Sequence, residues 1–168
     1  MKTRFHKVAV LLGIALLLAG CAEDGPVPTG IATVRLAVVA GAEHGGAPFA
    51  TPMTTEITST PVYTGDPDGV GDALITINLG QREVCWELSV ANIVLPGTAA
   101  HIHRAPAGVR GGIVVFLTPP NASGTVAGCA SDQNATVLHE ILLDPAAFYV
   151  NVHTTDYPAG AVRGQLGR

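Results

Sequence analysis

The sequence has little positive charge. Nine lysine and arginine residues stand against 13 acidic ones, and both lysines lie within the first seven positions. No cluster of lysine or arginine follows them along the chain. Because binding to a phosphate backbone requires a basic surface, this composition argues against a nucleic-acid partner.

The sequence also lacks a hydrophobic run long enough to cross a membrane. Its apolar stretch at residues 8–19 has 12 residues, whereas a membrane-spanning helix needs about 20. Lys2, Arg4 and Lys7 precede this stretch, and small residues follow it. A charged start, a short apolar core and small residues at the end are typical of an export signal.

The end of this signal, Leu18-Ala19-Gly20-Cys21, resembles the lipobox of bacterial lipoproteins. The resemblance implies that residues 1–20 are a cleaved signal peptide and that a lipid on Cys21 anchors the chain to the cell envelope. An ordinary secretory signal is the alternative. Because Ala22 rather than an acidic residue follows Cys21, the resemblance favours the outer membrane in a bacterium with two membranes. With one membrane, the chain would lie on the extracellular face of the plasma membrane.

The rest of the chain divides into a tether and one domain. Residues 21–30 form the lipidated cysteine and tether, because 23–30 is short, polar and rich in proline and glycine. Residues 31–168 suffice for one domain with a single core. Cleavage would remove three basic residues and no acidic one, leaving a net charge of −7.

Cysteine is scarce, with three in the chain and no C-x-x-C motif. With Cys21 assigned to lipid, Cys85 and Cys129 remain in a compartment where disulfides persist. A bond between them would close a loop of 45 residues, which is worth about 4 kcal/mol in the chain-entropy model. A metal or redox pair is the alternative, disfavoured by the wide separation of the two cysteines.

Short β-type runs separated by glycine- and proline-rich turns occupy most of the domain. The runs are 33–39, 73–79, 83–90, 99–104, 112–117, 148–153 and 161–166, and the turns are 64–71, 96–97, 119–124 and 157–160. Residues 135–143 alone have apolar side chains at helical spacing, with Asn134 or Thr136 as a cap and Asp144-Pro145 as an end. This pattern predicts an all-β fold, an antiparallel Greek-key β-sandwich with one short inserted helix.

Two stretches, AHIHRAPAGVRGGIVVFL at 100–117 and FYVNVHTTDYPAGAVRGQL at 148–166, carry a distinctive series of motifs. The series resembles the CHRD domain, first described in the secreted developmental antagonist chordin and found in bacterial envelope proteins. Segments 39–43 and 84–90 resemble the family's earlier strands, so the resemblance spans roughly residues 31–167. It implies an extracytoplasmic domain without an established catalytic activity.

The same stretches place three histidines on strands. Alternate residues of a strand share a face, so His101 and His103 point one way, and Asn151 and His153 share a face opposite two valines. If these strands adjoin, three imidazoles converge. Imidazole is a suitable ligand for copper and zinc.

This pattern also resembles the copper half-site of copper/zinc superoxide dismutase, in which an H-x-H strand and a later V-x-H strand supply ligands. The resemblance implies copper, or less favourably zinc, on His101, His103 and His153, with Arg163 as the analogue of the arginine that guides the anionic substrate. The sequence departs from the pattern, because it lacks the zinc-loop cluster and a fourth histidine at the bridging position. Cys85 also precedes the H-x-H strand, unlike the dismutase arrangement.

Three roles stay open for the histidines: hydrogen bonds that fasten loops, a metal site, and proton transfer. No serine or cysteine nucleophile stands out beside them. The leading interpretation is a non-enzymatic binding or structural module that recognises an extracytoplasmic protein or small ligand. The alternative, from a different class, is a copper-binding, superoxide-dismutase-like redox protein.

The remaining polar candidates have simpler interpretations. Arg163 is expected to pair with a carboxylate such as Glu87, or to bind carbonyls, rather than to bind a substrate. A glycine-rich loop lacks the terminal glutamate of a calcium-binding EF-hand, so its acids are expected to be solvated: Asp66, Asp68 and Asp72. His44 and His139 are also expected to be solvated, and Trp86 is expected to fill the core.

Overall fold

The computed structural model describes residues 45–167. The expected signal peptide, Cys21, the tether, the strand at 33–39 and His44 lie outside the described residues, so what was expected of them stays a prediction. Within the described part of the chain, no helix is long and apolar enough to cross a membrane.

Ten strands, one α-helix and one short 3-10 helix make up the described chain. They are β1 (Ala47–Thr55), β2 (Ile57–Ser59), β3 (Val62–Thr64), β4 (Val70–Asn78), β5 (Glu83–Ala91), β6 (Ala99–Arg104), β7 (Gly112–Leu117), β8 (Thr125–Ala130), α1 (Ala135–Leu143), η2 (Pro145–Ala147), β9 (Phe148–His153) and β10 (Val162–Gln165).

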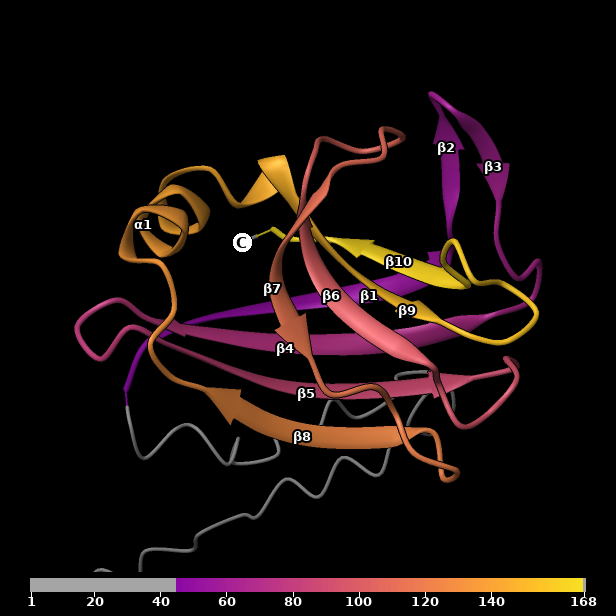
Figure 1. The fold of residues 1–168 in the computed structure, drawn as a ribbon, viewed down its shortest axis with the longest axis horizontal. Coiled ribbons are helices and arrows are strands. Elements are labelled where there is room, and N and C mark those ends of the chain that lie inside the picture. The colour runs from indigo at the N-terminus through magenta and orange to yellow at the C-terminus, as the bar shows by residue number, and fades with distance from the viewer. Residues whose placement is uncertain (1–44, 168) are drawn as a thin grey trace, which may run out of the picture. The chain divides into compact units, whose positions relative to one another are not determined.

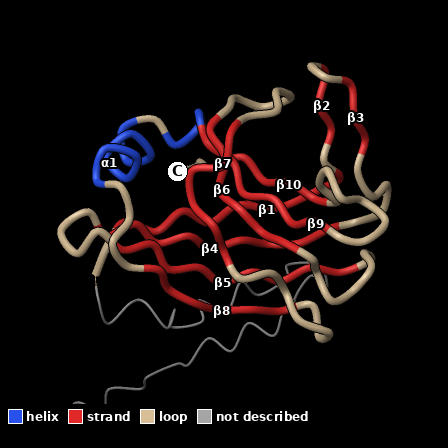
Figure 2. The backbone as a smooth tube through the Cα atoms, in the orientation of Figure 1, coloured by secondary structure: helices blue, strands red, loops and turns tan. Residues whose placement is uncertain are grey.

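Eight strands form one antiparallel sheet in the order β7-β6-β9-β10-β1-β4-β5-β8. The sheet curls, so that the half containing β6, β7 and β9 crosses the half containing β4, β5 and β8 (Figure 1; Figure 2). The hairpin of β2 and β3 projects away from the sheet. The predicted all-β antiparallel fold with one short helix is therefore confirmed, with both layers of the sandwich formed by halves of a single sheet.

Apolar side chains from both halves of the sheet meet in one core. Its fully buried members include Phe49, Ile75, Leu88, Ile102 and Val150. Helix α1 adds Leu138 and Ile141, both fully buried. Trp86 is also buried among them, as predicted. The apolar residues of the central strands are thus turned inward, and the residues that alternate with them point to the outer face of the sheet.

Several elements match the sequence prediction, namely the strands at 99–104, 112–117 and 148–153 and the helix at 135–143. The Asn134 side chain accepts hydrogen bonds from the backbone N–H groups of Thr136 and Val137, so it is the helix cap. The pattern of helical spacing was reliable here because α1 buries one face and exposes the other.

Strands β1, β2, β3 and β8 were not predicted. The two prolines of β1 argue against a strand, because proline has no N–H to donate to a neighbouring strand. The structure accommodates them because β10 pairs only with Thr54 and Thr55 of β1. Most of β1 is therefore paired on its β4 side alone. Strand β8 is the last of the described strands in the sheet, and it consists of small residues with no fully buried position. Its sequence therefore lacks the apolar alternation that marks a half-buried strand.

The predicted turn at 64–71 was too long, and of its three acids Asp66 alone differs from the expectation, because Asp68 and Asp72 are exposed. Thr64 ends β3, and β4 begins at Val70, so Asp72 belongs to a strand. Asp66 is buried rather than solvated, whereas Asp68 is exposed. The Asp66 backbone N–H donates to the carbonyl of Ala161, which draws this turn against the chain near β10.

The predicted disulfide is confirmed between Cys85 and Cys129. The two residues are direct partners in the pairing of β5 with β8, with Cα atoms 4.0 Å apart. Among the described strands β8 pairs with β5 alone, so the disulfide holds the last strand of this sheet to its neighbour.

We expect the double variant Cys85→Ala/Cys129→Ala to lose about 2–4 kcal/mol of unfolding free energy, because the unfolded chain regains the entropy of an open loop. Urea denaturation followed by the fluorescence of Trp86, the only tryptophan, measures this loss. Wild-type protein treated with reductant is the matched control and should unfold at a similarly lowered midpoint. An unchanged midpoint in both samples would contradict the stabilising role of the disulfide.

Candidate metal centre

Strands β6, β9 and β10 lie side by side and arrange their polar residues in rows. His101 of β6 is opposite Asn151 of β9, which is opposite Arg163 of β10. In the next row, His103, Tyr149 and Gln165 occupy the corresponding positions. Opposite residues in an antiparallel pair project on the same side of the sheet. The rows therefore gather their side chains on one face.

This face is the outer one, turned away from the core. Between the polar residues of β6 and β9 lie Ile102, Val150 and Val152, all fully buried in the apolar cluster. The strand alternation expected from the sequence is thus present. The register of β6 against β7 shifts between Ile102 and His103, an irregularity of the kind that re-aims side chains near functional sites.

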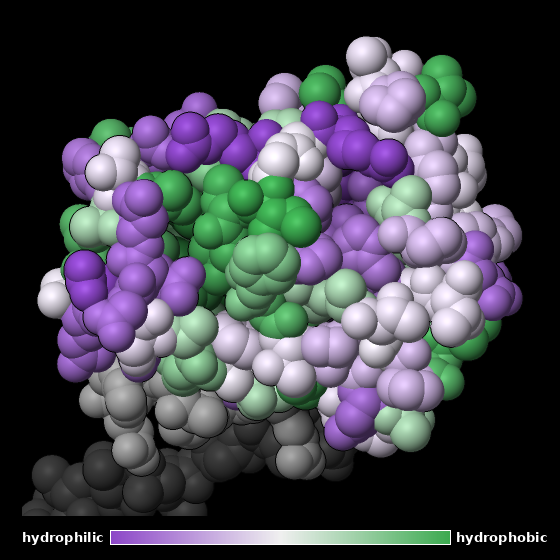
Figure 3. All heavy atoms as spheres, in the orientation of Figure 1, coloured by the Kyte–Doolittle hydropathy of each residue, from purple (hydrophilic) through white to green (hydrophobic). Residues whose placement is uncertain are grey.

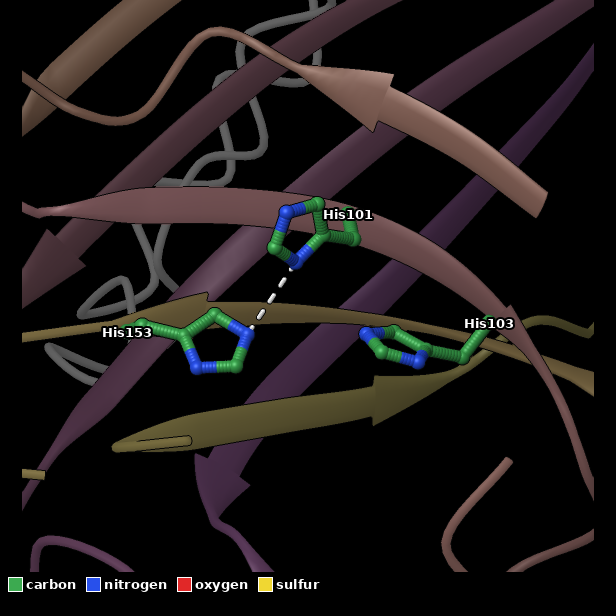
Figure 4. A group of neighbouring side chains, drawn as sticks. All are labelled: His101, His103 and His153. Carbon is green, nitrogen blue, oxygen red and sulfur yellow. Dashed lines mark hydrogen bonds between the residues drawn. The ribbon is translucent and has the colours of Figure 1, made fainter. Parts of the chain in front are cut away.

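The three histidines converge on this outer face. One ligand nitrogen from each of His101, His103 and His153 lies within 4.8 Å of the others. Figure 4 shows the rings of His101 and His153 directed toward one another, with His103 beside them. His101 Nδ1 is 3.2 Å from His153 Nε2. The sequence-predicted set therefore meets in space.

Backbone carbonyls orient two of the rings. His103 Nδ1 lies 3.0 Å from the carbonyl oxygen of Gly111, and His153 Nδ1 lies 3.1 Å from that of Pro158. A carbonyl can only accept, so both Nδ1 atoms carry the proton, and each neutral ring keeps a lone pair on Nε2. The Nε2 atom of His103 is buried and makes no hydrogen bond to a described residue. Metal-binding histidines characteristically donate their far N–H to such a carbonyl.

Burial lowers the pKa of all three histidines. Desolvation is the largest cause in each, and for His101 the neighbouring His153 and His103 add to it, lowering the pKa to about 4. The hydrogen bonds to Gly111 and Pro158 favour the charged forms of His103 and His153, but burial still lowers the pKa of both rings. Neutral imidazole, the form that binds metal ions, therefore predominates at pH 7.

Asn151 connects the three histidines to the buried side chain of Glu56. Its Nδ2 donates to Glu56 Oε2 at 3.0 Å, and its Oδ1 lies 3.1 Å from His153 Nε2. A carboxylate oxygen accepts, so this contact assigns the amide orientation and turns Oδ1 toward the histidines. Glu56 is fully buried, and desolvation raises its pKa despite the opposing effects of Asn151 and Arg163.

Arg163 holds a loop over the site rather than pairing with Glu87. Its guanidinium donates to the carbonyl oxygens of Pro106 and Val109, each at 2.8 Å, and lies over the Tyr149 ring at 3.3 Å from the centroid. The expectation of carbonyl binding is confirmed and that of Glu87 as partner is wrong, because Glu87 is on β5, in the other half of the sheet. With 8% of its surface exposed, Arg163 gives no support to a substrate-guiding role.

An aromatic stack supports the deepest histidine. The rings of His103 and Tyr149 are parallel to within 6°, with centroids 4.8 Å apart. On the outer side, Phe116 of β7 packs edge-on against His101 at 5.2 Å between centroids and is 71% exposed. Figure 3 shows apolar side chains gathered over β7 and beside α1. The site therefore lies between a buried stack and an exposed apolar surface.

The other candidates lie apart from this centre or are already bonded. His139 is exposed on α1, as predicted. Glu83 lies near Cys85 and Cys129, but the two sulfur atoms are bonded to each other. Among the described residues, the three histidines are therefore the cluster whose ligand atoms are not already bonded covalently to one another.

Sequence reasoning missed Glu56, Tyr149 and the two orienting carbonyls. Glu56 sits between β1 and β2 in a threonine-rich segment whose pattern does not indicate burial. Its partner Asn151 is 95 residues away. Gly160 was recognised only as part of a turn, yet a Cβ there would lie 1.8 Å from Glu56 Oε2, and its φ is +131°. No pattern among neighbouring residues of the sequence predicts contacts of this kind.

We expect Arg163→Lys to lose about 1–3 kcal/mol of unfolding free energy, because one ammonium cannot satisfy both loop carbonyls. Hydrogen exchange at residues 106–111 should accelerate in the same variant. Arg82→Lys, at an exposed arginine paired with Asp132, is the control and should change stability little. Equal exchange rates in the loop of Arg163→Lys and wild type would refute the fastening role.

Comparison with known proteins gives one family match. A family model described as the CHRD domain matches residues 49–166. A search of curated proteins found no match, and a search of solved structures found none. The matched segment runs from β1 to the residue after β10 and contains the three histidines, Asn151 and Arg163. The chain therefore belongs to the CHRD domain family.

Proposed function

We propose that the protein is a lipid-anchored CHRD binding module of the cell envelope whose ligand is a transition-metal ion held by His101, His103 and His153. The observation that carries this proposal is the convergence of three imidazole nitrogens within 4.8 Å. The membership of the family supports an extracellular type of binding or structural module.

The spacing of the ligand atoms supports a shared ion. Two nitrogens bonded at about 2.0 Å to one tetrahedral ion lie roughly 3.3 Å apart, and His101 Nδ1 and His153 Nε2 are 3.2 Å apart. His103 Nε2 is the remaining ligand, buried and without a hydrogen bond to a described residue. His101 and His153 are partly exposed, so an ion can enter on their side.

Copper(II) is the favoured ion and zinc the second choice. Three neutral imidazoles suit both, and the affinity of a nitrogen site for divalent first-row metals peaks at copper. The disulfide of the same domain agrees with an oxidising compartment, where copper(II) persists. Binding, rather than superoxide dismutation, is proposed because Arg163 is buried and engaged with the loop.

We expect the protein, purified from membranes in detergent and stripped with chelator, to bind one Cu(II) per chain in calorimetric titration. The triple variant His101→Ala/His103→Ala/His153→Ala should lose this stoichiometric binding, since all three imidazole ligands are gone. His139→Ala is the matched control, because it removes one exposed histidine from α1. Wild-type protein that binds no stoichiometric Cu(II) or Zn(II), or a triple variant that binds as wild type does, would end the metal proposal.

Membrane anchoring has a separate test. We expect Cys21→Ser to abolish incorporation of labelled palmitate and to move the exported protein from the membrane fraction to the soluble fraction, because the acylated thiol is lost. In a bacterium with two membranes, Ala22→Asp should retain the lipidated protein at the inner membrane. Palmitate-free wild-type protein would contradict the anchor.

A further inference from the structure

We propose that Asn151 supplies the fourth ligand of the metal site through Oδ1, and that the buried carboxylate of Glu56 orients this amide and balances the charge of the ion. This inference rests on the proposed function and assigns two residues beyond the three histidines. It makes the ligand set three imidazole nitrogens and one amide oxygen.

The first support is the lone-pair arrangement around His153 Nε2. Its ring proton is on Nδ1, which faces the carbonyl oxygen of Pro158 at 3.1 Å. The Nε2 lone pair therefore meets the lone pairs of Asn151 Oδ1 at 3.1 Å. Two acceptors at this distance repel unless a positive species lies between them. A metal ion bonded to both atoms removes this repulsion. Two ligand atoms of one tetrahedral ion lie at a similar distance from each other.

The second support is burial. Asn151 is 1% exposed, so water has little access to Oδ1. Oδ1 lies 3.1 Å from His153 Nε2, and a ligand nitrogen of His103 lies within 4.8 Å of one of His153. Oδ1 is therefore placed beside the group of imidazole nitrogens. This buried amide oxygen has lone pairs and carries no hydrogen, so it can bind a metal ion together with the imidazole nitrogens.

Glu56 explains why the amide points this way. Its Oε2 accepts from Asn151 Nδ2 at 3.0 Å, which leaves Oδ1 toward the histidines. Gly160 makes room for the carboxylate, because any Cβ at this position would collide with Oε2. The other oxygen, Oε1, is buried without a hydrogen bond to a described residue.

The charge of the site requires a counter-ion. Three neutral imidazoles and one amide bring no negative charge to a divalent ion, and an uncompensated buried charge is costly. The Glu56 carboxylate is one hydrogen bond away from the proposed oxygen ligand. An opposite charge close by favours the ionised form of a carboxylate. Removing a group that holds a metal ligand in place in this way typically changes metal affinity by about 10–100-fold.

The test compares three variants in the full protein loaded with Cu(II). Glu56→Gln keeps the shape and the hydrogen bond to Asn151 but removes the charge, so its Kd should rise about tenfold. Asn151→Ala removes the oxygen ligand, so its Kd should rise by about 10–100-fold and its Cu(II) EPR parameters should change. Asp156→Asn removes a charge from an exposed residue of the loop after His153 and should leave both quantities unchanged.

A double variant separates ligation from mere support of the fold. In Glu56→Gln/Asn151→Asp the amide and carboxylate exchange places, which preserves both the hydrogen bond and the total charge. Its Cu(II) affinity should recover relative to Glu56→Gln, because the anionic oxygen now bonds to the ion directly. Failure of this recovery, or wild-type Kd values and EPR spectra in both Asn151→Ala and Glu56→Gln, would overturn the inference while the three-histidine site stands. Wild-type protein without stoichiometric metal would overturn the proposed function as well.

Discussion

The pairing of β9 with β6 on one side and with β10 on the other is the interaction on which the site depends. It aligns His101, Asn151 and Arg163 in one row across three strands. A slip of one residue would turn Val150 and Val152 outward and bring polar side chains into the core. Because these valines are fully buried, burial of the apolar face specifies the register. The same hydrophobic burial that stabilises the fold therefore places the histidines.

Loops cover the candidate site on the outer face. Arg163 holds the loop after β6 through two carbonyls, and that loop supplies the Gly111 carbonyl that orients His103. The loop before β10 supplies the Pro158 carbonyl for His153. These contacts leave the Nε2 lone pairs of His103 and His153 free of a proton, and a ligand nitrogen of His101 lies within 4.8 Å of theirs. The same cover removes water, which lowers the histidine pKa values and keeps the rings neutral.

The regions that could be predicted share a local physical signal. Strands with one apolar face, such as 99–104 and 148–153, carry a period of two, and the helix at 135–143 carries its own period and cap. The disulfide could be predicted because the export signal indicates an oxidising compartment and two cysteines remain after Cys21. Strand β8 lacks apolar alternation, and the position of Asp66 depends on a contact with Ala161. Neither feature leaves a pattern within a few residues of sequence.

The sequence by itself determined the all-β class, the cysteine pair and the strand faces of His101, His103 and His153, because alternation and composition are local properties of the chain. Only the tertiary structure decided that β6 and β9 are neighbours, that carbonyls of two loops set the imidazole tautomers, and that Glu56 meets Asn151. These contacts join residues as much as 95 positions apart. Their formation depends on strand order and loop closure, which arise from packing the whole domain around one core.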